Sequence, residues 1–90
     1  MPRARIIVHG RVQGVGFRYH AARRAEALGV SGYARNEYDG TVEIEAQADE
    51  KTLARFVEEI REGPSFSLVT SLDVTPMPES QESNGFRVRH

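Results

Sequence analysis

The spacing of apolar residues changes repeatedly along this chain, and the order of those changes restricts the fold more than any other feature. β-Branched or alternating runs predict strands, and apolar residues at helical spacing predict helices. The pattern predicts strands over residues 5–9, 30–36, 42–47, 68–75 and 86–89, and helices over residues 17–28 and between Asp49 and Gly63. Two strand-helix-strand units followed by a further strand are typical of the ferredoxin-like split β-α-β fold. We therefore predict an α+β sandwich in which two helices cover one face of an antiparallel sheet.

Capping and turn residues mark the ends of these elements. Gly29 follows the first helical stripe, and Asp49 is a suitable N-cap for the second. Asp39-Gly40 predicts a tight turn between the second and third strands. The loop before the last strand is expected to contain Pro76, Pro78, Ser80 and Ser83.

Length and composition fit one globular domain spanning residues 1–90. The chain is 39% apolar and 28% charged, which is ordinary for a globular protein. No apolar run approaches the roughly 18–20 residues of a membrane span, and the N-terminal run is too short for a signal peptide. The absence of cysteine excludes disulfides and thiolate metal sites. We expect a cytoplasmic monomer without nucleic-acid or membrane partners.

A glycine-rich segment joins the first predicted strand to the first predicted helix. Gly10, Gly14 and Gly16 lie within seven residues, and Arg18 falls in the first helical turn. Glycine allows backbone N–H groups to turn towards a ligand, and a helix N-terminus adds unpaired N–H groups and partial positive charge. Arginine adds a planar donor fork that matches two phosphate oxygens. The segment therefore predicts a phosphate-binding loop, although glycine spacing alone also fits a plain strand-to-helix turn.

Three better-known phosphate loops do not fit this segment. A Walker loop ends in Gly-Lys-Ser/Thr, whereas Phe17-Arg18 stands at that place. The glycine order differs from the Gly-x-Gly-x-x-Gly fingerprint of dinucleotide-binding domains. A cysteine-based phosphatase is excluded because the chain has no cysteine to attack phosphorus.

The net charge of −1 conceals opposite charges in different parts of the chain. Residues 1–36 carry seven arginines and one acidic residue, a net charge of +6. Residues 37–86 carry twelve acidic residues and three basic ones, a net charge of −9, and the last four residues add +2. The glycine-rich segment lies in the basic part, where a positive field would attract small anions.

Two segments resemble the signatures of the acylphosphatase family. The first is Gly10-x-Val12-Gln13-Gly14-Val15-x-Phe17-Arg18, and the second is Gly32-Tyr33-Ala34-Arg35-Asn36-Glu37-Tyr38-Asp39-Gly40-Thr41-Val42. The final Gly85-Phe86-Arg87-Val88-Arg89-His90 resembles the closing strand of the family. Because the two signatures occur in the expected order and spacing, the resemblance is far more specific than either one alone, and it covers nearly the whole chain.

The resemblance implies that Arg18 and Asn36 are the catalytic pair. Arg18 would bind the phosphoryl oxygens together with backbone N–H groups of the loop, which comprises Gln13, Gly14, Val15, Gly16, Phe17 and Arg18. Asn36 would orient a water molecule for attack on phosphorus, since its neutral amide offers both acceptor and donors. The implied reaction hydrolyses an acyl phosphate to a carboxylate and inorganic phosphate without a cofactor or metal. As a separate hypothesis, the substrate's own phosphate accepts the proton of the water, which would explain the lack of a general base.

The three histidines do not predict a metal site. His9, His20 and His90 are scattered along the chain, and no thiol accompanies them. Positioning and charge stabilisation can suffice for phosphoryl transfer, so the lack of a nucleophile–base pair is consistent with the implied reaction.

Two other function classes are compatible with parts of this sequence. One is a module that binds an acyl or carbamoyl phosphate without turnover; the presence of Arg18 and Asn36 favours activity. The other is a nucleic-acid binder, because RNA-recognition domains share this strand order. Strand 42–46 has no stacking aromatic, and Glu43 and Glu45, expected on the face away from the helices, would repel phosphates.

Overall fold

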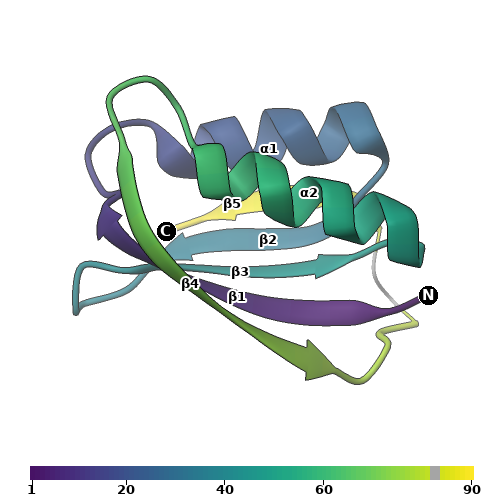
Figure 1. The fold of residues 1–90 in the computed structure, drawn as a ribbon. Helices are drawn as coiled ribbons and strands as arrows, with labels where there is room; N and C mark the ends of the chain where they lie inside the picture. The colour runs from purple at the N-terminus through teal and green to yellow at the C-terminus, as the bar shows by residue number, and fades with distance from the viewer. Residues whose placement is uncertain (82–83) are drawn as a thin grey trace.

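The computed structural model describes residues 1–81 and 84–90 and contains all seven predicted elements (Figure 1). In chain order they are β1 (Arg3–Arg11), α1 (Phe17–Leu28), β2 (Ser31–Asn36), β3 (Val42–Gln47), α2 (Glu50–Glu62), β4 (Leu68–Met77) and β5 (Phe86–Arg89). Gly29 ends α1 in the left-handed conformation, and Asp49 caps α2 by accepting a hydrogen bond from Thr52 N. The ferredoxin-like fold is therefore confirmed.

The five strands form one sheet in the order β4-β1-β3-β2-β5, and both helices lie on the same face of it (Figure 1). The sheet is not wholly antiparallel as predicted, because β5 runs parallel to β2. β4 and β5 occupy opposite edges of the sheet. β4 ends and β5 begins at the end of the sheet where β2 begins, so β5 runs in the same direction as β2.

The connection from β4 to β5 is held against the end of β3. Gln47 Nε2 donates to Ser80 O at 3.0 Å, and Ser80 N donates to Gln47 Oε1 at 2.8 Å. Pro76, predicted in this loop, lies within β4, where an edge strand tolerates a residue without an N–H. Ser83, also predicted in the loop, lies outside the described residues.

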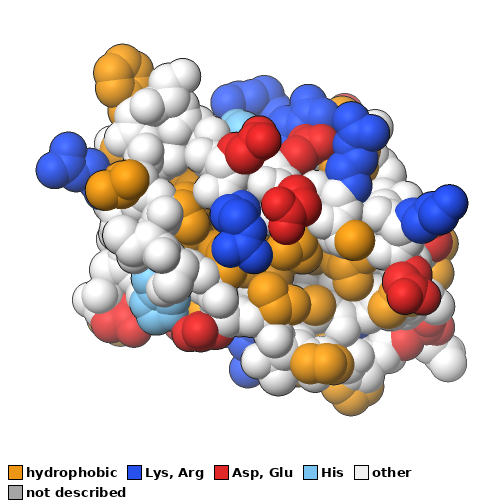
Figure 2. Space-filling view, viewed as in Figure 1, with side chains coloured by type: hydrophobic (Ala, Val, Ile, Leu, Met, Phe, Trp, Pro, Cys, Tyr) orange, Lys and Arg blue, Asp and Glu red, His pale blue; other side chains and the backbone are white. Residues whose placement is uncertain are grey.

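The hydrophobic core lies between the helices and the sheet. Alternate residues of the strands point towards the helices, which bury Phe17 from α1 and Phe56 and Ile60 from α2. Figure 2 shows charged side chains of both signs across the helix layer, with apolar side chains between them. Among the described residues, no helix is long and apolar enough to cross a membrane.

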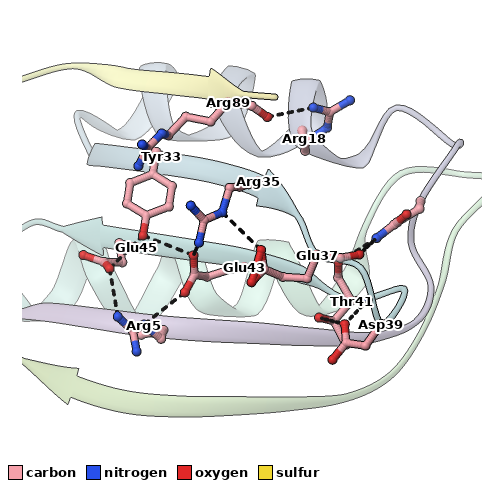
Figure 3. A network of polar contacts seen from close by, with 11 residues as sticks. Arg5, Arg18, Tyr33, Arg35, Glu37, Asp39, Thr41, Glu43, Glu45 and Arg89 are labelled. Carbon is pink, nitrogen blue, oxygen red and sulfur yellow. Dashed lines mark hydrogen bonds and ion pairs between the residues drawn. The ribbon is translucent and has the colours of Figure 1, made fainter.

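The opposite face of the sheet carries Glu43 and Glu45, as predicted, but both carboxylates are engaged there in ion pairs and hydrogen bonds with neighbouring side chains. Arg35 Nη2 contacts Glu43 Oε1 at 2.9 Å, and Arg5 Nε contacts Glu43 Oε2 at 3.2 Å. The hydroxyl of Tyr33 donates to Glu45 Oε2 at 2.8 Å. These contacts keep the two carboxylates largely out of water, and Figure 3 shows them side by side.

His20 links the stability of the helix layer to pH. It lies on α1 beside Phe17, and its burial, with Arg23 and Arg24 nearby, lowers its pKa although Glu59 opposes the shift. The unfolded chain therefore takes up this proton at a higher pH than the folded chain does. We expect the free energy of unfolding to fall as pH drops below about 6.5, and His20→Gln to remove part of that fall. Denaturant unfolding of the parent and of His20→Gln between pH 7.5 and 5.5 measures this dependence. An equal change in the free energy of unfolding with pH in both proteins would refute the prediction.

Candidate active site

The loop between β1 and α1 forms a small arch of backbone. Val12, 1% exposed, anchors the loop in the core. Gly14 and Gly16 then adopt left-handed conformations, with φ of 75° and 76°, and among the described residues only glycines have positive φ. Alternation of left- and right-handed residues turns successive N–H groups towards one side, which creates an anion-binding concavity. Side chains other than glycine would be strained at both positions.

The N-terminus of α1 is open, whereas that of α2 is occupied. Asp49 caps α2, and Glu50 follows in its first turn. By contrast, Gly16 at the start of α1 provides no side-chain cap, and the first turn contains no acidic residue. The first hydrogen bond of α1 runs from His20 N to Gly16 O, so earlier N–H groups lack helical acceptors. The partial positive charge at this helix end is therefore available to an anion.

Asn36 reaches the same place from the end of β2. Ala34 is buried beneath the helices, and Asn36, two residues further on, points to the same face of the sheet. A small hollow of about 110 Å³ is lined by Val12, Gly14, Gly16, Phe17, Arg18, Tyr19 and Asn36. Within the described part of the chain the Asn36 side chain makes no hydrogen bond, so its amide is free to bind water or ligand.

The side chain of Gln13 ties the loop to the β2–β3 turn. Its Nε2 donates to Glu37 O at 2.7 Å and to Thr41 O at 2.9 Å. Both amide hydrogens are thus used by the turn, so the donor that Gln13 can offer to an anion in the loop is its backbone N–H. This contact fixes the distance between the glycine-rich loop and the strand end that carries Asn36.

Arg18 is held from the other side by the end of β5. Its Nη1 donates to Arg89 O at 2.8 Å and lies 3.2 Å from Nδ1 of His90 (Figure 3 shows the first contact). No carboxylate contacts this guanidinium among the described residues. Arg18 therefore retains donors and an uncompensated charge beside the hollow.

A larger hollow of about 770 Å³ adjoins the small one at Asn36. Its lining is polar and charged: Gln13, Arg35, Asn36, Glu37, Tyr38 and His90. Arg35 Nε contacts Glu37 Oε2 at 3.1 Å, and the carboxylates of Glu37 and Glu43 raise the pKa of Arg35 (Figure 3). Within the described chain, no three side chains of His, Cys, Asp or Glu gather in a way that could hold a metal ion.

Comparison with known proteins identifies the family of this chain. The family model described as acylphosphatase matches residues 4–88. The chain belongs to the acylphosphatase family. Among curated acylphosphatases, that of Chlorobaculum tepidum is 46% identical over 86 residues, covering 96% of this chain and 94% of the relative. That of Bacillus licheniformis is 47% identical, covering 92% and 89%.

A solved acylphosphatase agrees over the full length. The crystal structure of acylphosphatase from Bacillus subtilis matches with a TM-score of 0.96 and 41% identity, covering all of both chains. The arrangement of two helices on a five-stranded sheet is thus shared with a family member of known crystal structure.

The residues predicted from the two acylphosphatase signatures converge in space. Arg18, Asn36, Gly14, Gly16 and Phe17 line one hollow, while Gln13 lines its neighbour. Val15 packs partly against the core instead of lining either hollow.

Sequence reasoning missed two groups that contact Arg18. These are the carbonyl of Arg89 and the ring of His90. The available signal was the closing strand itself: pairing of β5 with β2 places Arg89 opposite Arg35, next to Asn36.

Proposed function

We propose that Arg18 and the backbone of the 13–18 loop bind the phosphoryl group of an acyl phosphate, and that Asn36 orients the attacking water. Membership of the acylphosphatase family makes this chain an enzyme that hydrolyses small acyl phosphates. The observation that carries the assignment of roles is the single hollow lined by Arg18, Asn36 and the uncapped start of α1. We further propose that residues 1–90 constitute one catalytic domain.

The groups in the hollow suit the charge that a phosphoryl group carries. The guanidinium of Arg18 and the N–H groups of the arch are all donors, so each can stabilise a phosphoryl oxygen as negative charge develops. They are ordered before the ligand arrives, because the loop is fixed by Val12 and by the side chain of Gln13. An ordered donor set needs little rearrangement during the reaction, which is where such sites gain most of their rate.

Asn36 suits a water-positioning role for two reasons. Its amide has no protein hydrogen-bond partner among the described residues, so its acceptor and donors are available. It is also neutral, so it does not repel the phosphoryl oxygens as a carboxylate would. In-line attack requires this water to lie on the side of phosphorus opposite the leaving carboxylate. The carboxylate needs no protonation to leave, and a phosphoryl oxygen of the substrate accepts the proton of the water.

A phosphate-release assay tests the proposal. With acetyl phosphate or benzoyl phosphate and excess chelator, we expect full activity, because the donors in the hollow are protein groups and no metal takes part. An alkyl phosphate monoester in the same assay should remain intact, since its alkoxide is a much poorer leaving group than a carboxylate. Activity that disappears with chelator and returns with a divalent cation would contradict a metal-independent mechanism.

The alternative of a binding module without turnover is not favoured, because the curated relatives at 46–47% identity are named as enzymes. We also propose that the enzyme works as a cytoplasmic monomer without nucleic-acid or membrane partners. The absence of cysteine and the two carboxylates on the sheet face support this setting.

A further inference from the structure

The contacts of the Arg18 guanidinium divide its donors into two sets. Arginine has five N–H donors in one plane. Nη1 carries two of them, and it has two acceptors within reach: Arg89 O at 2.8 Å and His90 Nδ1 at 3.2 Å. The side chain makes no other hydrogen bond among the described residues. The donors on Nε and Nη2, which point along the other edge of the plane, are left for a ligand.

We propose that His90 is a positioning residue that holds Arg18, through a hydrogen bond to its neutral imidazole, with the Nε–Nη2 edge presented to the phosphoryl group. The proposal rests on the function assigned to Arg18 above. An imidazole nitrogen accepts a hydrogen bond only while it carries no proton, so Nδ1 must be the bare nitrogen and Nε2 the protonated one. The bond therefore selects one tautomer of His90 as well as one orientation of Arg18.

The Nε–Nη2 edge is the geometry that binds two oxygens of one anion through parallel hydrogen bonds. A single contact at Arg89 O would still let the guanidinium plane rotate about that bond. Two acceptors on the two hydrogens of Nη1 define the plane, because both must lie close to it. His90 thus removes rotational freedom that phosphate binding would otherwise have to remove, and preorganisation of this kind strengthens binding.

The surroundings of His90 support an acceptor role. It shares the larger hollow with Gln13 from the loop and with Arg35, Asn36, Glu37 and Tyr38 at the end of β2 and beyond. Two guanidinium groups, Arg18 and Arg35, flank this space, and one carboxylate, Glu37, faces it, already paired with Arg35. The cation that His90 contacts has no carboxylate partner among the described residues, so the neutral ring supplies an acceptor without cancelling the charge that phosphate requires.

Two variants separate the acceptor from the ring. His90→Asn can place its amide oxygen near the position of Nδ1, and His90→Phe keeps a ring of similar size without any acceptor. Each is compared with the parent in the Kd for orthophosphate, measured by titration, and in KM and kcat for acetyl phosphate. We expect His90→Phe to raise Kd and KM about three- to tenfold, with a smaller change in kcat, and His90→Asn to stay within about twofold of the parent.

Three results would overturn the proposal. Weaker phosphate binding in His90→Asn than in His90→Phe would mean that packing of the ring matters and the acceptor does not. An unchanged Kd in His90→Phe would mean that the bond does not order Arg18. Tighter phosphate binding in His90→Phe would mean that His90 competes with the ligand for Arg18.

A third variant distinguishes this inference from the function on which it rests. In an Arg18→Ala background, His90→Phe should cause no further change in Kd, because its partner is gone. If Arg18→Ala alone weakens phosphate binding while His90→Phe does not, only the role of His90 fails. If Arg18→Ala binds orthophosphate as well as the parent, the phosphate site itself is misassigned. Thermal unfolding of each variant confirms that the comparison is made between folded proteins.

Discussion

Replacing Arg18 with alanine is expected to lower kcat/KM for acetyl phosphate by at least about 10²–10³-fold, the usual loss for one preorganised donor at a developing charge. Arg18 supplies two donors and a full charge to the hollow, and it is the only basic side chain among the described residues that line it. The remaining N–H groups of the arch cannot replace that charge. Initial rates of phosphate release over a range of substrate concentrations measure the loss.

Two further variants, Arg18→Lys and Arg23→Ala, show whether activity depends on the geometry of the Arg18 guanidinium or only on its positive charge. Lysine keeps the charge but lacks the planar fork, so Arg18→Lys should also be severely impaired. Arg23 lies exposed on the same helix, away from the hollow, and its replacement should leave the rate near that of the parent. High activity in Arg18→Lys would indicate that phosphate binding needs only a positive charge at this position.

Replacing Asn36 with alanine is expected to lower kcat by about 10²-fold while the Kd for orthophosphate changes little, because misplacing a reacting group can cost that much. Asn36 lines the hollow but carries no charge, so its loss removes orientation of the water more than affinity for the anion. Turnover of acetyl phosphate and a separate phosphate titration measure the two quantities independently.

A matched control for Asn36 is available at the opposite end of the sheet. Asn84 lies just before β5, outside both hollows of the active site, and Asn84→Ala should behave as the parent does. Full turnover in Asn36→Ala would remove the water-positioning role, and a large rise in the Kd for orthophosphate would reassign Asn36 to phosphate binding.

Local chemistry made most of the fold predictable. The apolar stripe of α2 and its cap at Asp49 define that helix without reference to the rest of the chain, and Gly29 likewise ends α1. The direction of β5 was not predictable in the same way. An edge strand needs only one partner, and its direction depends on the path of a loop whose anchor, the paired contact between Gln47 and Ser80, has no local sequence signal.

The candidate site likewise has one part that could be predicted from the sequence and another that could not. Gly14, Gly16 and Arg18 form a local motif, so their neighbourhood could be predicted from a single segment. The contacts of Arg18 with Arg89 and His90 depend on where β5 docks, and the contacts of Gln13 depend on the β2–β3 turn. Long-range contacts of this kind follow from the assembled sheet and not from spacing within a segment.

Arg18 and the carbonyl that holds it are 71 positions apart in the sequence, and the paired residues of β1 and β4, such as Arg3 and Met77, are also far apart along the chain. Chains dominated by such distant pairings fold slowly, since each long loop must close before its contacts can form. Hydrolysis regained after dilution from denaturant should consequently lag behind the return of helical signal. We therefore expect the return of catalysis to report the docking of β5 beside Arg18, not the first appearance of compact structure.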